Sequence, residues 1–542
     1  MKRSAQSKIL HHNAGRPLTS LSLCINLLPG TTNALEFKMT RFMRTAALLG
    51  LAGIPFVAAL AATDQVPTYS KDIAPIMQTS CQRCHNPNSV APTSFLTYEQ
   101  VRPFAREIKR RTALKYAPAS RGVMPPWFLE ANIGIQHMED DISLSDAQIS
   151  MIAKWADNGA PRGNPADEPK PLSFADPTTW QLGKPDLIVS TPTIFVAAIA
   201  ADWGGSFGKT PLGLDVDRYA KSSEWQEQTS LKKAGAINGG RFVFHHATTS
   251  ISGPDDEDQD AEQGESSVGP NSFPIHEVGR NGDVFPEDAG KLLPAGGFIN
   301  WGSMHIHSAG SAGSERYARL DVGVRLHPLG YKPTRQERPY TFGRTELQMD
   351  PNTPNQREDA YFVAPSAMKL TNFEPHLHTT GVRMCLQAII GRSVETLNCS
   401  GYDHNWVRNY QYTPGYEPLI PKGTILHAIS WTDNTASNND VMDPRNTSTF
   451  GNSSTSNMFI MFNLAEFLSD EDYAKEVQMR KEFLALTHQN PIGCIACYLP
   501  PAKKPAPKTD AKAAPKDGAA PATAPAAKEE APDTKVKQVA GN

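Results

Sequence analysis

The pentapeptide Cys81-Gln82-Arg83-Cys84-His85 constrains this chain more than any other feature of its sequence. Two cysteines separated by two residues, with a histidine directly after the second, form the attachment pattern of a c-type haem. The two thiols add across the haem vinyl groups, and the adjacent histidine is held beneath the iron as an axial ligand. A zinc site or a redox-active CxxC motif is the competing interpretation, which the adjacent histidine and the signs of export described below disfavour.

A second axial ligand for the iron is expected from the same small region. Met124 is the best candidate, because the prolines of Met124-Pro125-Pro126-Trp127 would hold its loop stiffly. A thioether ligand stabilises the reduced iron and raises the reduction potential. His137 is the alternative ligand. The other methionines of this region are expected to be core residues: Met77, Met138 and Met151.

Residues 66–165 carry a helical pattern. Between Ala147 and Asn158, apolar residues such as Ile149 and Ile152 recur at helical spacing, and Gly159 follows as a stop signal. Together with the CxxCH motif and Met-Pro-Pro-Trp, two further runs resemble bacterial class I cytochrome c domains: Ser70-Lys-Asp-Ile-Ala-Pro-Ile-Met and Trp155-Ala-Asp-Asn-Gly-Ala-Pro. The resemblance implies a small all-α domain that carries one covalent haem c.

The segment beginning at Met39 predicts export. Arg41 and Arg44 provide a positive start, residues 46–62 form an apolar run, and Ala59-Leu60-Ala61 matches a small-x-small cleavage site. We therefore expect a signal peptide over residues 39–62 and a periplasmic or secreted protein. Retention of the run as a membrane anchor is the alternative, since its length is near the lower limit for spanning a bilayer.

Residues 1–38 lie upstream of a normal signal peptide. We therefore interpret the start codon as assigned too early, so that these residues do not belong to the protein. Cys24 and the His11-His12 pair then fall outside the mature protein. At 542 residues the chain is long for one core, so several domains are expected. A net charge of −3 gives no basic field for nucleic acid.

After residue 165 the pattern changes. A proline-rich linker (166–179) leads into short alternating apolar runs, such as Arg241-Phe-Val-Phe-His, which Gly, Pro and Asn interrupt. These runs predict sandwich-like β structure with a boundary between 328 and 339. The acidic stretch 255–265 is expected to be a solvated loop, and the Ala/Pro/Lys-rich tail 501–542 to be disordered.

Histidines occur in groups within this β region. They are His245-His246, His305-Ile-His307 and His376-Leu-His378. In a strand, residues two apart point to the same face, so His376 and His378 can chelate one ion. Adjacent residues point to opposite faces, so His245 and His246 can share a metal only at a strand end or a bulge. Imidazole suits copper, and a thioether partner favours Cu(I).

The order of these groups resembles the copper type II monooxygenases, the family of peptidylglycine α-hydroxylating and dopamine β-monooxygenases. Pro375-His-Leu-His-Thr-Thr-Gly matches the family's PHxHxxG element. Tyr402-Asp-His-Asn-Trp, Trp431-Thr-Asp-Asn and the run from Phe450 to Met458 are similar to its YDxNW, DN and methionine-ligand segments. The resemblance spans residues 180–470 and implies two antiparallel, jelly-roll-like β-sandwich domains, at 180–335 and 336–490.

The resemblance implies two copper sites. The first would hold the electron-storing copper with His245, His246 and His305. The second would hold the O2-activating copper with His376, His378 and Met458, which are the expected catalytic residues. His307 is expected to be incidental or to support a ligand. The remaining histidines of this region are expected to be structural, with His404 also able to orient a ligand: His276, His327, His404, His427 and His488.

Several positions depart from the family pattern. Glu374 stands where peptide-hydroxylating members carry the arginine that grips a substrate carboxylate, and Phe462 stands where they carry a tyrosine. A peptide C-terminus is therefore a poor expectation for the substrate. Four further cysteines, 385, 399, 494 and 497, could form disulfides with three possible connectivities. Cys385 and Cys399 could pair across a hairpin. Cys494 and Cys497 lack a following histidine, which argues against a second haem and leaves a disulfide, with a metal site as the alternative.

These observations predict a copper-dependent monooxygenase that hydroxylates a C–H bond of a small organic substrate with O2. The fused haem would deliver electrons from an external donor, either a soluble cytochrome or an ascorbate-like reductant. The alternative is a non-catalytic periplasmic protein that carries electrons or binds copper, because a fold never proves an activity. The sequence does not identify the substrate.

Overall fold

The structure is a computed structural model. The residues that it describes are 65–87, 89, 91–116, 122–174, 179–199, 203–230, 243–256, 272–277, 282–307, 315–335, 337–451, 453, 455–487 and 492–498. The expected upstream segment (1–38), signal peptide (39–62) and tail (501–542), most of the acidic stretch 255–265, and His488 lie outside the described residues. In the described part, no helix is both long enough and apolar enough to cross a membrane.

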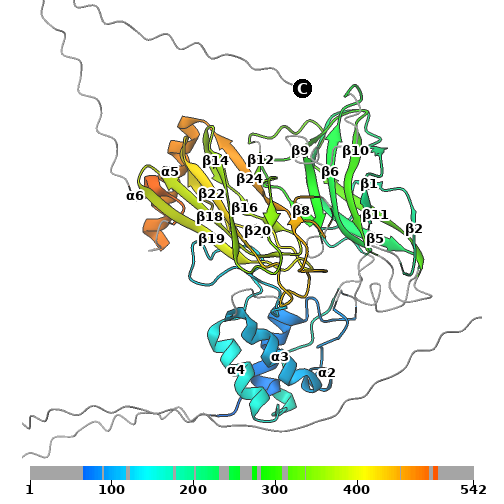
Figure 1. Cartoon of the computed structure of the whole chain (residues 1–542), viewed down its shortest axis with the longest axis vertical. Helices are drawn as coiled ribbons and strands as arrows, with labels where there is room; N and C mark the ends of the chain where they lie inside the picture. Colours follow the sequence, from blue (N-terminus) through cyan, green and yellow to red (C-terminus); the bar gives the residue numbers. More distant parts are fainter. Residues whose placement is uncertain are drawn as a thin grey trace, which may run out of the picture. The chain divides into compact units, whose positions relative to one another are not determined.

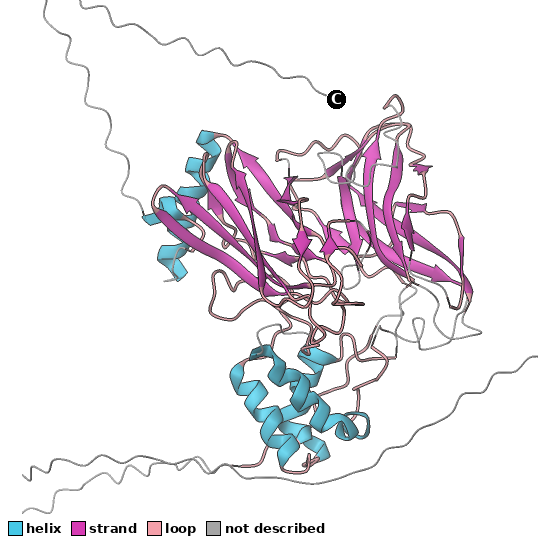
Figure 2. Cartoon of the chain, viewed as in Figure 1, coloured by secondary structure: helices cyan, strands magenta, loops and turns pink. Residues whose placement is uncertain are grey.

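Helices dominate the N-terminal region (Figures 1 and 2). They are η1 Tyr69–Ile73, α1 Ala74–Ile76, η2 Met77–Cys81, α2 Tyr98–Val101, η3 Arg102–Phe104, α3 Ala105–Ala113, η4 Leu114–Tyr116, α4 Asp146–Asp157 and η5 Pro165–Asp167. The expected helix near 147–158 is confirmed as α4. Ser145 and Gln148 form a capping box at its start, and Gly159 follows it with a φ of +81°.

The helices enclose a small core of their own, with Ile73, Met77, Ile152 and Trp155 at its centre. The proline-rich segment after them packs back onto the first helix. Backbone N–H groups of Tyr69 and Ser70 donate to the carbonyls of Pro161 and Arg162.

Part of this N-terminal region belongs to a different core. Leu129 forms a β-bridge with Ser400, and the N–H of Ile135 donates to the carbonyl of Leu397. The buried side chains of Trp127, Leu129, Ile135 and Met138 pack in the core of the C-terminal β region. Met77 and Met138 are both core residues, as expected, but they sit in two different cores.

The first β region, expected at 180–335, contains two antiparallel sheets. Its strands are β1 Leu187–Ser190, β2 Ile194–Val196, β3 Trp203–Gly205, β4 Lys209–Pro211, β5 Arg218–Thr229, β6 Phe244–Ser252, β7 Ser272–Glu277, β8 Gly282–Val284, β9 Lys291–Leu293, β10 Phe298–Ile306 and β11 Arg316–Leu326. One sheet has the order β1-β11-β5-β8, with β2 on β11 and β9 on β5; the other has the order β3-β10-β6-β7, with β4 on β10.

Alternating apolar residues of both sheets meet in one core, which makes this region a two-layer sandwich. Trp225 and Val322 come from one sheet, and Phe244, Ile299 and Trp301 come from the other. The opposite face of the β6/β10 sheet carries the histidines described below.

The second β region follows a connection between Leu326 and Glu337. Its strands are β12 Glu337–Arg344, β13 Gln348–Met349, β14 Gln356–Val363, β15 Ala367–Leu370, β16 Asn372–Phe373, β17 Pro375–Leu377, β18 Gly381–Ile390, β19 Ser393–Gly401, β20 Tyr410–Gln411, β21 Leu419–Ile420, β22 Ile425–Thr432, β23 Ser448–Thr449 and β24 Phe459–Leu468. The main sheets have the orders β12-β24-β15-β21, with β17 on β24, and β14-β22-β18-β19. Their inner faces share one apolar core, so this region is also a sandwich.

Two disulfides and two helices complete the second sandwich. Cys385 and Cys399 are directly opposite on β18 and β19 and form the expected hairpin disulfide. Helix α5 (Asp470–Thr487) and helix α6 (Ile495–Tyr498) follow β24, and the expected Cys494–Cys497 disulfide stands at the start of α6. The β-rich part of the predicted fold class is therefore confirmed.

Candidate metal centre

A β-bulge brings His245 and His246 to one face of the first sandwich. On the neighbouring strand, His305 is opposite His246, and the next residue, Ile306, is opposite Phe244. His245 is therefore an extra residue without a direct partner. Phe244 and Ala247 both point into the core, although they are three residues apart. The bulge thus leaves both histidines on the outer face, which meets the condition that the sequence set for sharing one metal.

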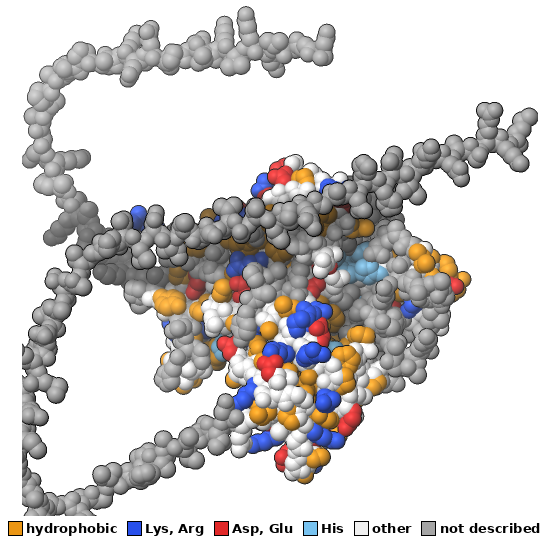
Figure 3. Space-filling view, turned by 60° about the horizontal axis from the view of Figure 1, so that its bottom comes forward, with side chains coloured by type: hydrophobic (Ala, Val, Ile, Leu, Met, Phe, Trp, Pro, Cys, Tyr) orange, Lys and Arg blue, Asp and Glu red, His pale blue; other side chains and the backbone are white. Residues whose placement is uncertain are grey.

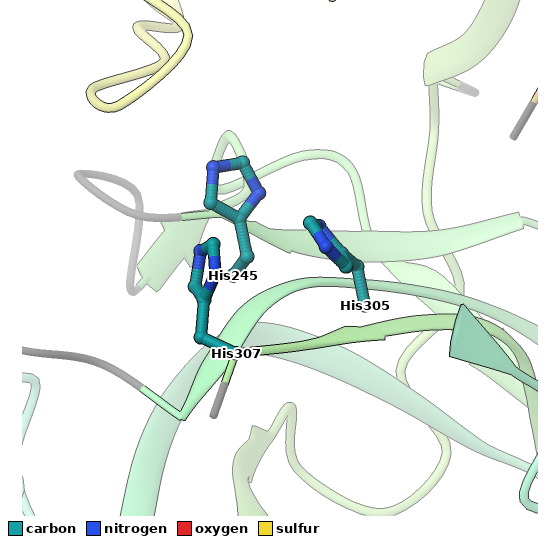
Figure 4. A group of neighbouring side chains, drawn as sticks. All are labelled: His245, His305 and His307. Carbon is teal, nitrogen blue, oxygen red and sulfur yellow. The ribbon is translucent and has the colours of Figure 1, made fainter. Parts of the chain in front are cut away.

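The tightest histidine group differs from the expected one. His305 is the penultimate residue of β10 and His307 follows directly after the strand, so the two are two residues apart and both rings lie on the outer face near His245. One ring nitrogen from each of His245, His305 and His307 lies within 4.8 Å of the others (Figure 4). His307, expected to be incidental, thus belongs to the compact group, which we call the first histidine group.

His246 lies beside this group. Its Nδ1 is 3.5 Å from Nδ1 of His245, and its ring centroid is 5.3 Å from that of His305. Two imidazole nitrogens bound to one tetrahedral ion at about 2.0–2.1 Å would be about 3.3 Å apart. The spacing between His245 and His246 therefore also fits a shared ion.

The protonation of His245 suits metal binding. Its Nε2 is 3.0 Å from the carbonyl oxygen of His404, so this nitrogen carries the proton and Nδ1 keeps its lone pair. Burial, followed by the neighbouring imidazole of His246, holds the pKa of His245 well below its usual range. Burial also lowers the pKa of His246. Neutral imidazoles are the form that binds metals.

The second histidine group, His376 and His378, lies at β17 of the second sandwich. Leu377 between them points into the core, so both histidines face outward. Their ring centroids are 5.4 Å apart, and both side chains are buried. Burial, followed by the nearby His376, lowers the pKa of His378 to about 3.

Strand register relates Met458 to this group. In the β17/β24 ladder, His376 is opposite Ile460 and Leu377 is opposite Phe459. Continued by one residue, the same register sets Met458 opposite His378, on the same face of the sheet. Met458 is half-buried and directly precedes β24. The structure thus brings the three expected residues of the second site to one end of one ladder.

Glu277 is a site residue that sequence reasoning missed. It ends β7 directly opposite His246, and its Oε1 is 3.1 Å from Nδ1 of His376, although their alignment falls short of a hydrogen bond. The side chain is only 1% exposed, and within the described residues its Oε2 has no hydrogen-bond partner. The sequence around Glu277 gave no indication of its contact with His376, because the contact forms between strands that are far apart in the sequence.

The histidines expected to be structural divide into two kinds. His427 is paired on both sides, with Asp359 at 2.6 Å and Gln387 at 3.2 Å, and His327 is 3.0 Å from the carbonyl of Ala289. The Nε2 of His276 lies 3.3 Å from the carbonyl of Phe244. His404 differs, because neither of its ring nitrogens has a hydrogen-bond partner among the described residues. Asp403 does not pair with it.

The local geometry of the CxxCH segment is compatible with a haem c. The helical stretch ends at Cys81, and the N–H of His85 donates to the Cys81 carbonyl, which closes a tight turn. Nδ1 of His85 is 2.8 Å from the carbonyl of Thr93, and the ring stacks on Phe95. A proton on Nδ1 leaves the lone pair on Nε2, the atom an axial ligand requires.

The two thiols of the motif fit the same group. Neither Cys81 nor Cys84 forms a disulfide. Burial raises the pKa of the Cys81 thiol to about 12 and also raises that of Cys84. An environment that disfavours thiolates accepts the uncharged thioethers of an attached haem. Cys81, Cys84 and His85 therefore fit the group that their spacing predicted.

The candidates for the other axial position differ in their surroundings. Met124 is 41% exposed and lies next to helix α3, where its N–H donates to the carbonyl of Arg111. The ring of His137 stacks on Tyr416 of the second sandwich at 3.7 Å. Met124 thus stays with the helical region that holds the CxxCH motif, whereas the His137 side chain is engaged elsewhere.

The loop between β19 and β20 contacts both the N-terminal region and the first histidine group. Asp403 accepts a hydrogen bond from the N–H of Gly122, and the carbonyl of His404 accepts one from Nε2 of His245. The guanidinium of Arg408 lies 4.9 Å from the Trp127 ring centre. In the space-filling view, most of the visible histidine surface gathers at one place (Figure 3).

Comparisons with known proteins add no family. No family model matches the chain, and no curated protein matches it. Among solved structures, the empty top component of cowpea mosaic virus shares 9% identity at a TM-score of 0.25, over 55% of this chain and 93% of that one.

Two other solved structures are as distant. The infectious bursal disease virus VP2 particle shares 11% identity at a TM-score of 0.15, over 53% of this chain and 73% of that chain. A Bacillus subtilis oxalate decarboxylase shares 8% sequence identity at a TM-score of 0.11, over 56% of this chain and 85% of that chain. Scores this low carry no argument about fold or function, so the case for function comes from the residues themselves.

Proposed function

We propose that this protein is a copper-dependent monooxygenase, which hydroxylates a C–H bond of a small organic substrate with O2 and receives electrons through a haem c. The observation that carries the proposal is the convergence of the two histidine groups. Both lie on outward sheet faces, all of their histidines except the half-buried His307 are buried, and Glu277 of the first sandwich reaches His376 of the second. Buried imidazoles without apolar packing roles are typical of metal centres.

The first histidine group would hold one copper. His245 contributes Nδ1, because its Nε2 bonds to the carbonyl of His404. His305 and His307 present their rings from the end of one strand, and the bulge adds His246 beside them. Four neighbouring imidazoles without a sulfur ligand suit an ion that changes between Cu(II) and Cu(I).

The second histidine group would hold the other copper, with Met458 as its soft ligand. The sulfur favours Cu(I), the state that reacts with O2. Glu277 beside Nδ1 of His376 favours a proton on that atom, which leaves Nε2 for the metal. Copper at these sites would supply the one-electron storage and O2 chemistry that side chains lack.

The stoichiometry of hydroxylation is compatible with this arrangement. Hydroxylation converts R–H, O2, two electrons and two protons into R–OH and water. Two separate copper ions would each store one electron, which matches the two electrons that the reaction needs. The haem held by Cys81, Cys84, His85 and Met124 would accept electrons singly from an external donor, a soluble cytochrome or an ascorbate-like reductant, in a periplasmic or secreted protein.

The surroundings of the second group bear on the substrate. Glu374 is buried, and the side chain of Asn372 donates to it. The ring centroid of Phe462 is 4.9 Å from that of His376. Phe462 stands where the peptide-hydroxylating enzymes carry a tyrosine, so the site lacks that hydroxyl. Without a nearby arginine in place of Glu374, the site has no counter-ion at that position for a peptide carboxylate. We propose a neutral or weakly polar organic substrate.

A second function is favoured by one observation. His376 and His378 are 4% and 1% exposed, which describes a closed site better than one open to substrate. A non-catalytic protein that carries electrons or binds copper would have such a site. The two functions make different predictions, because only the enzyme consumes O2 in step with a product.

The deciding experiment uses the full-length exported protein loaded with copper and haem. The protein is reduced without oxygen, mixed with extracted small metabolites, and exposed to ¹⁸O-labelled O2. The monooxygenase proposal expects a metabolite that gains one labelled oxygen atom, with one O2 consumed per product. Reoxidation of the haem and copper without any labelled product would instead establish the electron carrier.

A further inference from the structure

The loop after β19 holds His404 in a fixed position. Before it, the Tyr402 hydroxyl donates to the carbonyl of Leu377, between the two histidines of the second group. Asp403 accepts from the N–H groups of Gly122 at 3.1 Å and Asn405 at 3.0 Å. The loop is therefore tied to the second sandwich and to the N-terminal region, which leaves the His404 backbone little freedom.

The His404 side chain is buried without a partner. It is 5% exposed, and neither Nδ1 nor Nε2 makes a hydrogen bond within the described residues. Buried polar groups in proteins are nearly always paired, and an exception calls for an explanation such as an ion. His427, at 7% exposure in the same sandwich, pairs with both Asp359 and Gln387, so burial alone does not leave a histidine unpaired.

The rings nearest to His404 belong to both histidine groups. Its centroid is 4.6 Å from that of His245, and 5.7 Å from that of His378. Its own carbonyl accepts the proton on Nε2 of His245. No carboxylate contact to its ring is seen in the described part of the chain. The surroundings of its two nitrogens thus resemble those of a ligand, and not those of an ion-paired histidine.

We propose that His404 is a metal ligand, which adds an imidazole from the second sandwich to the first histidine group of His245, His305 and His307. The shorter distance and the backbone bond both assign it to His245 and not to His378. The inference deepens the proposed function, and it rests on the metal-binding part of that function, not on oxygenation. The resemblance to known enzymes does not assign this residue, since the matching position in YDxNW is unspecified.

The arrangement has a structural consequence. A metal ion held by His245, His305 and His307 on one side and by His404 on the other links the two sandwiches. Imidazole ligands suit Cu(II) and Zn(II), so either ion serves as a probe. Binding should stabilise the contact between the sandwiches, and the unfolding temperature should rise more than binding within one sandwich would cause.

The test compares metal binding in matched variants of the full-length protein. His378→Ala first removes the second histidine group, so that one copper remains. In this background, His404→Ala is compared with the control His427→Ala. Copper affinity is measured by competition with a chromophoric chelator, and nitrogen coordination by electron paramagnetic resonance of Cu(II).

We expect His404→Ala to lower the affinity for the remaining copper ion by at least about tenfold, as the loss of a ligand or of a residue that supports a ligand does. The nitrogen hyperfine pattern should lose one coupled imidazole, and added free imidazole should restore it by entering the space left by the side chain. His427→Ala should leave both the affinity and the spectrum unchanged. Thermal unfolding of the metal-free protein checks folding, and His404→Leu, which fills the volume, replaces the alanine variant if the cavity destabilises it.

Two outcomes overturn the inference, and they are distinguishable. Equal affinity and identical spectra in the His404 and His427 variants would show that His404 is not a ligand, while leaving the proposed monooxygenase intact. Failure of the parent protein to bind Cu(II) or Zn(II) at all would refute both the inference and the copper-dependent function.

Discussion

Oε1 of Glu277 lies 3.1 Å from Nδ1 of His376, although Glu277 ends strand β7 of the first sandwich and His376 is in strand β17 of the second. Glu277 is also directly opposite His246, so the contact connects His376 with a histidine that precedes it by 130 residues in the sequence (from 246 to 376). A carboxylate beside a metal-binding histidine fixes which nitrogen carries the proton and how the ring is oriented.

This contact predicts the effect of Glu277→Gln. The amide keeps the size of the side chain but removes the charge that favours a proton on Nδ1 of His376. Copper at the second histidine group should bind about 10–100-fold more weakly, as is typical when such partners are lost. Chelator competition on the full-length protein measures the change.

Glu224→Gln is the control for that variant, since Glu224 is buried in the same sandwich and accepts from the N–H groups of Gln181 and Leu182. Glu224→Gln should lower the stability of the protein but leave its copper affinity unchanged. Equal copper affinity in both variants would remove Glu277 from the metal centre.

Met458→Ile should abolish oxygenation while leaving the fold. The change keeps an apolar side chain of similar size, and such substitutions usually cost less than about 1.5 kcal/mol. Loss of the sulfur removes the preference for Cu(I) at the second group. Substrate-dependent O2 uptake should fall by orders of magnitude, with the haem spectrum unchanged.

Met461→Ile is the matched control, because Met461 lies on the same strand but in the core. It should lower the unfolding temperature without a loss of uptake. If the Met458 variant retains both two copper ions and full turnover, Met458 is a packing residue and the second site is assigned wrongly.

Met124→Ala should change the haem iron. The weak near-infrared absorption band that arises from sulfur-to-iron charge transfer should disappear. The reduction potential of the haem should fall, because a thioether stabilises Fe(II). His137→Ala serves as the comparison, since its ring stacks on Tyr416. Absorption spectra and redox titration decide between them; an altered His137 variant beside an unchanged Met124 variant would reverse the assignment.

The mature protein should begin at Ala62 or Thr63. The arginine-flanked apolar run that ends in Ala59-Leu60-Ala61 predicts cleavage there. N-terminal sequencing of the exported protein tests this, and a product that still carries residues 1–38 would disprove both the cleavage and the later start.

Short-range patterns were readable in the sequence. The CxxCH motif specifies a turn in which Cys81, Cys84 and His85 are neighbours along the chain, and the structure supplies the bond from Nδ1 of His85 to the Thr93 carbonyl. Helix α4 follows from its apolar spacing and the glycine after it, and the structure adds the capping box at its start. The shared face of His376 and His378 follows from the two-residue period of strands. The pairing of Cys385 with Cys399 was one of the possible connectivities, and the register of β18 and β19 decided it.

Only the tertiary structure decided which groups meet across the chain. The sequence set the condition of a bulge or strand end for His245 and His246, but the register with β10 determined that a bulge is present. The tertiary structure also brought His307 into the first group, and it buried the His404 side chain without a hydrogen-bond partner within the described residues. The packing of Leu129 and Ile135 into the second sandwich has the same origin. Local preferences act over a few residues, whereas these contacts depend on how strands far apart in sequence align, and that alignment is settled by burying the whole apolar face of each sheet at once.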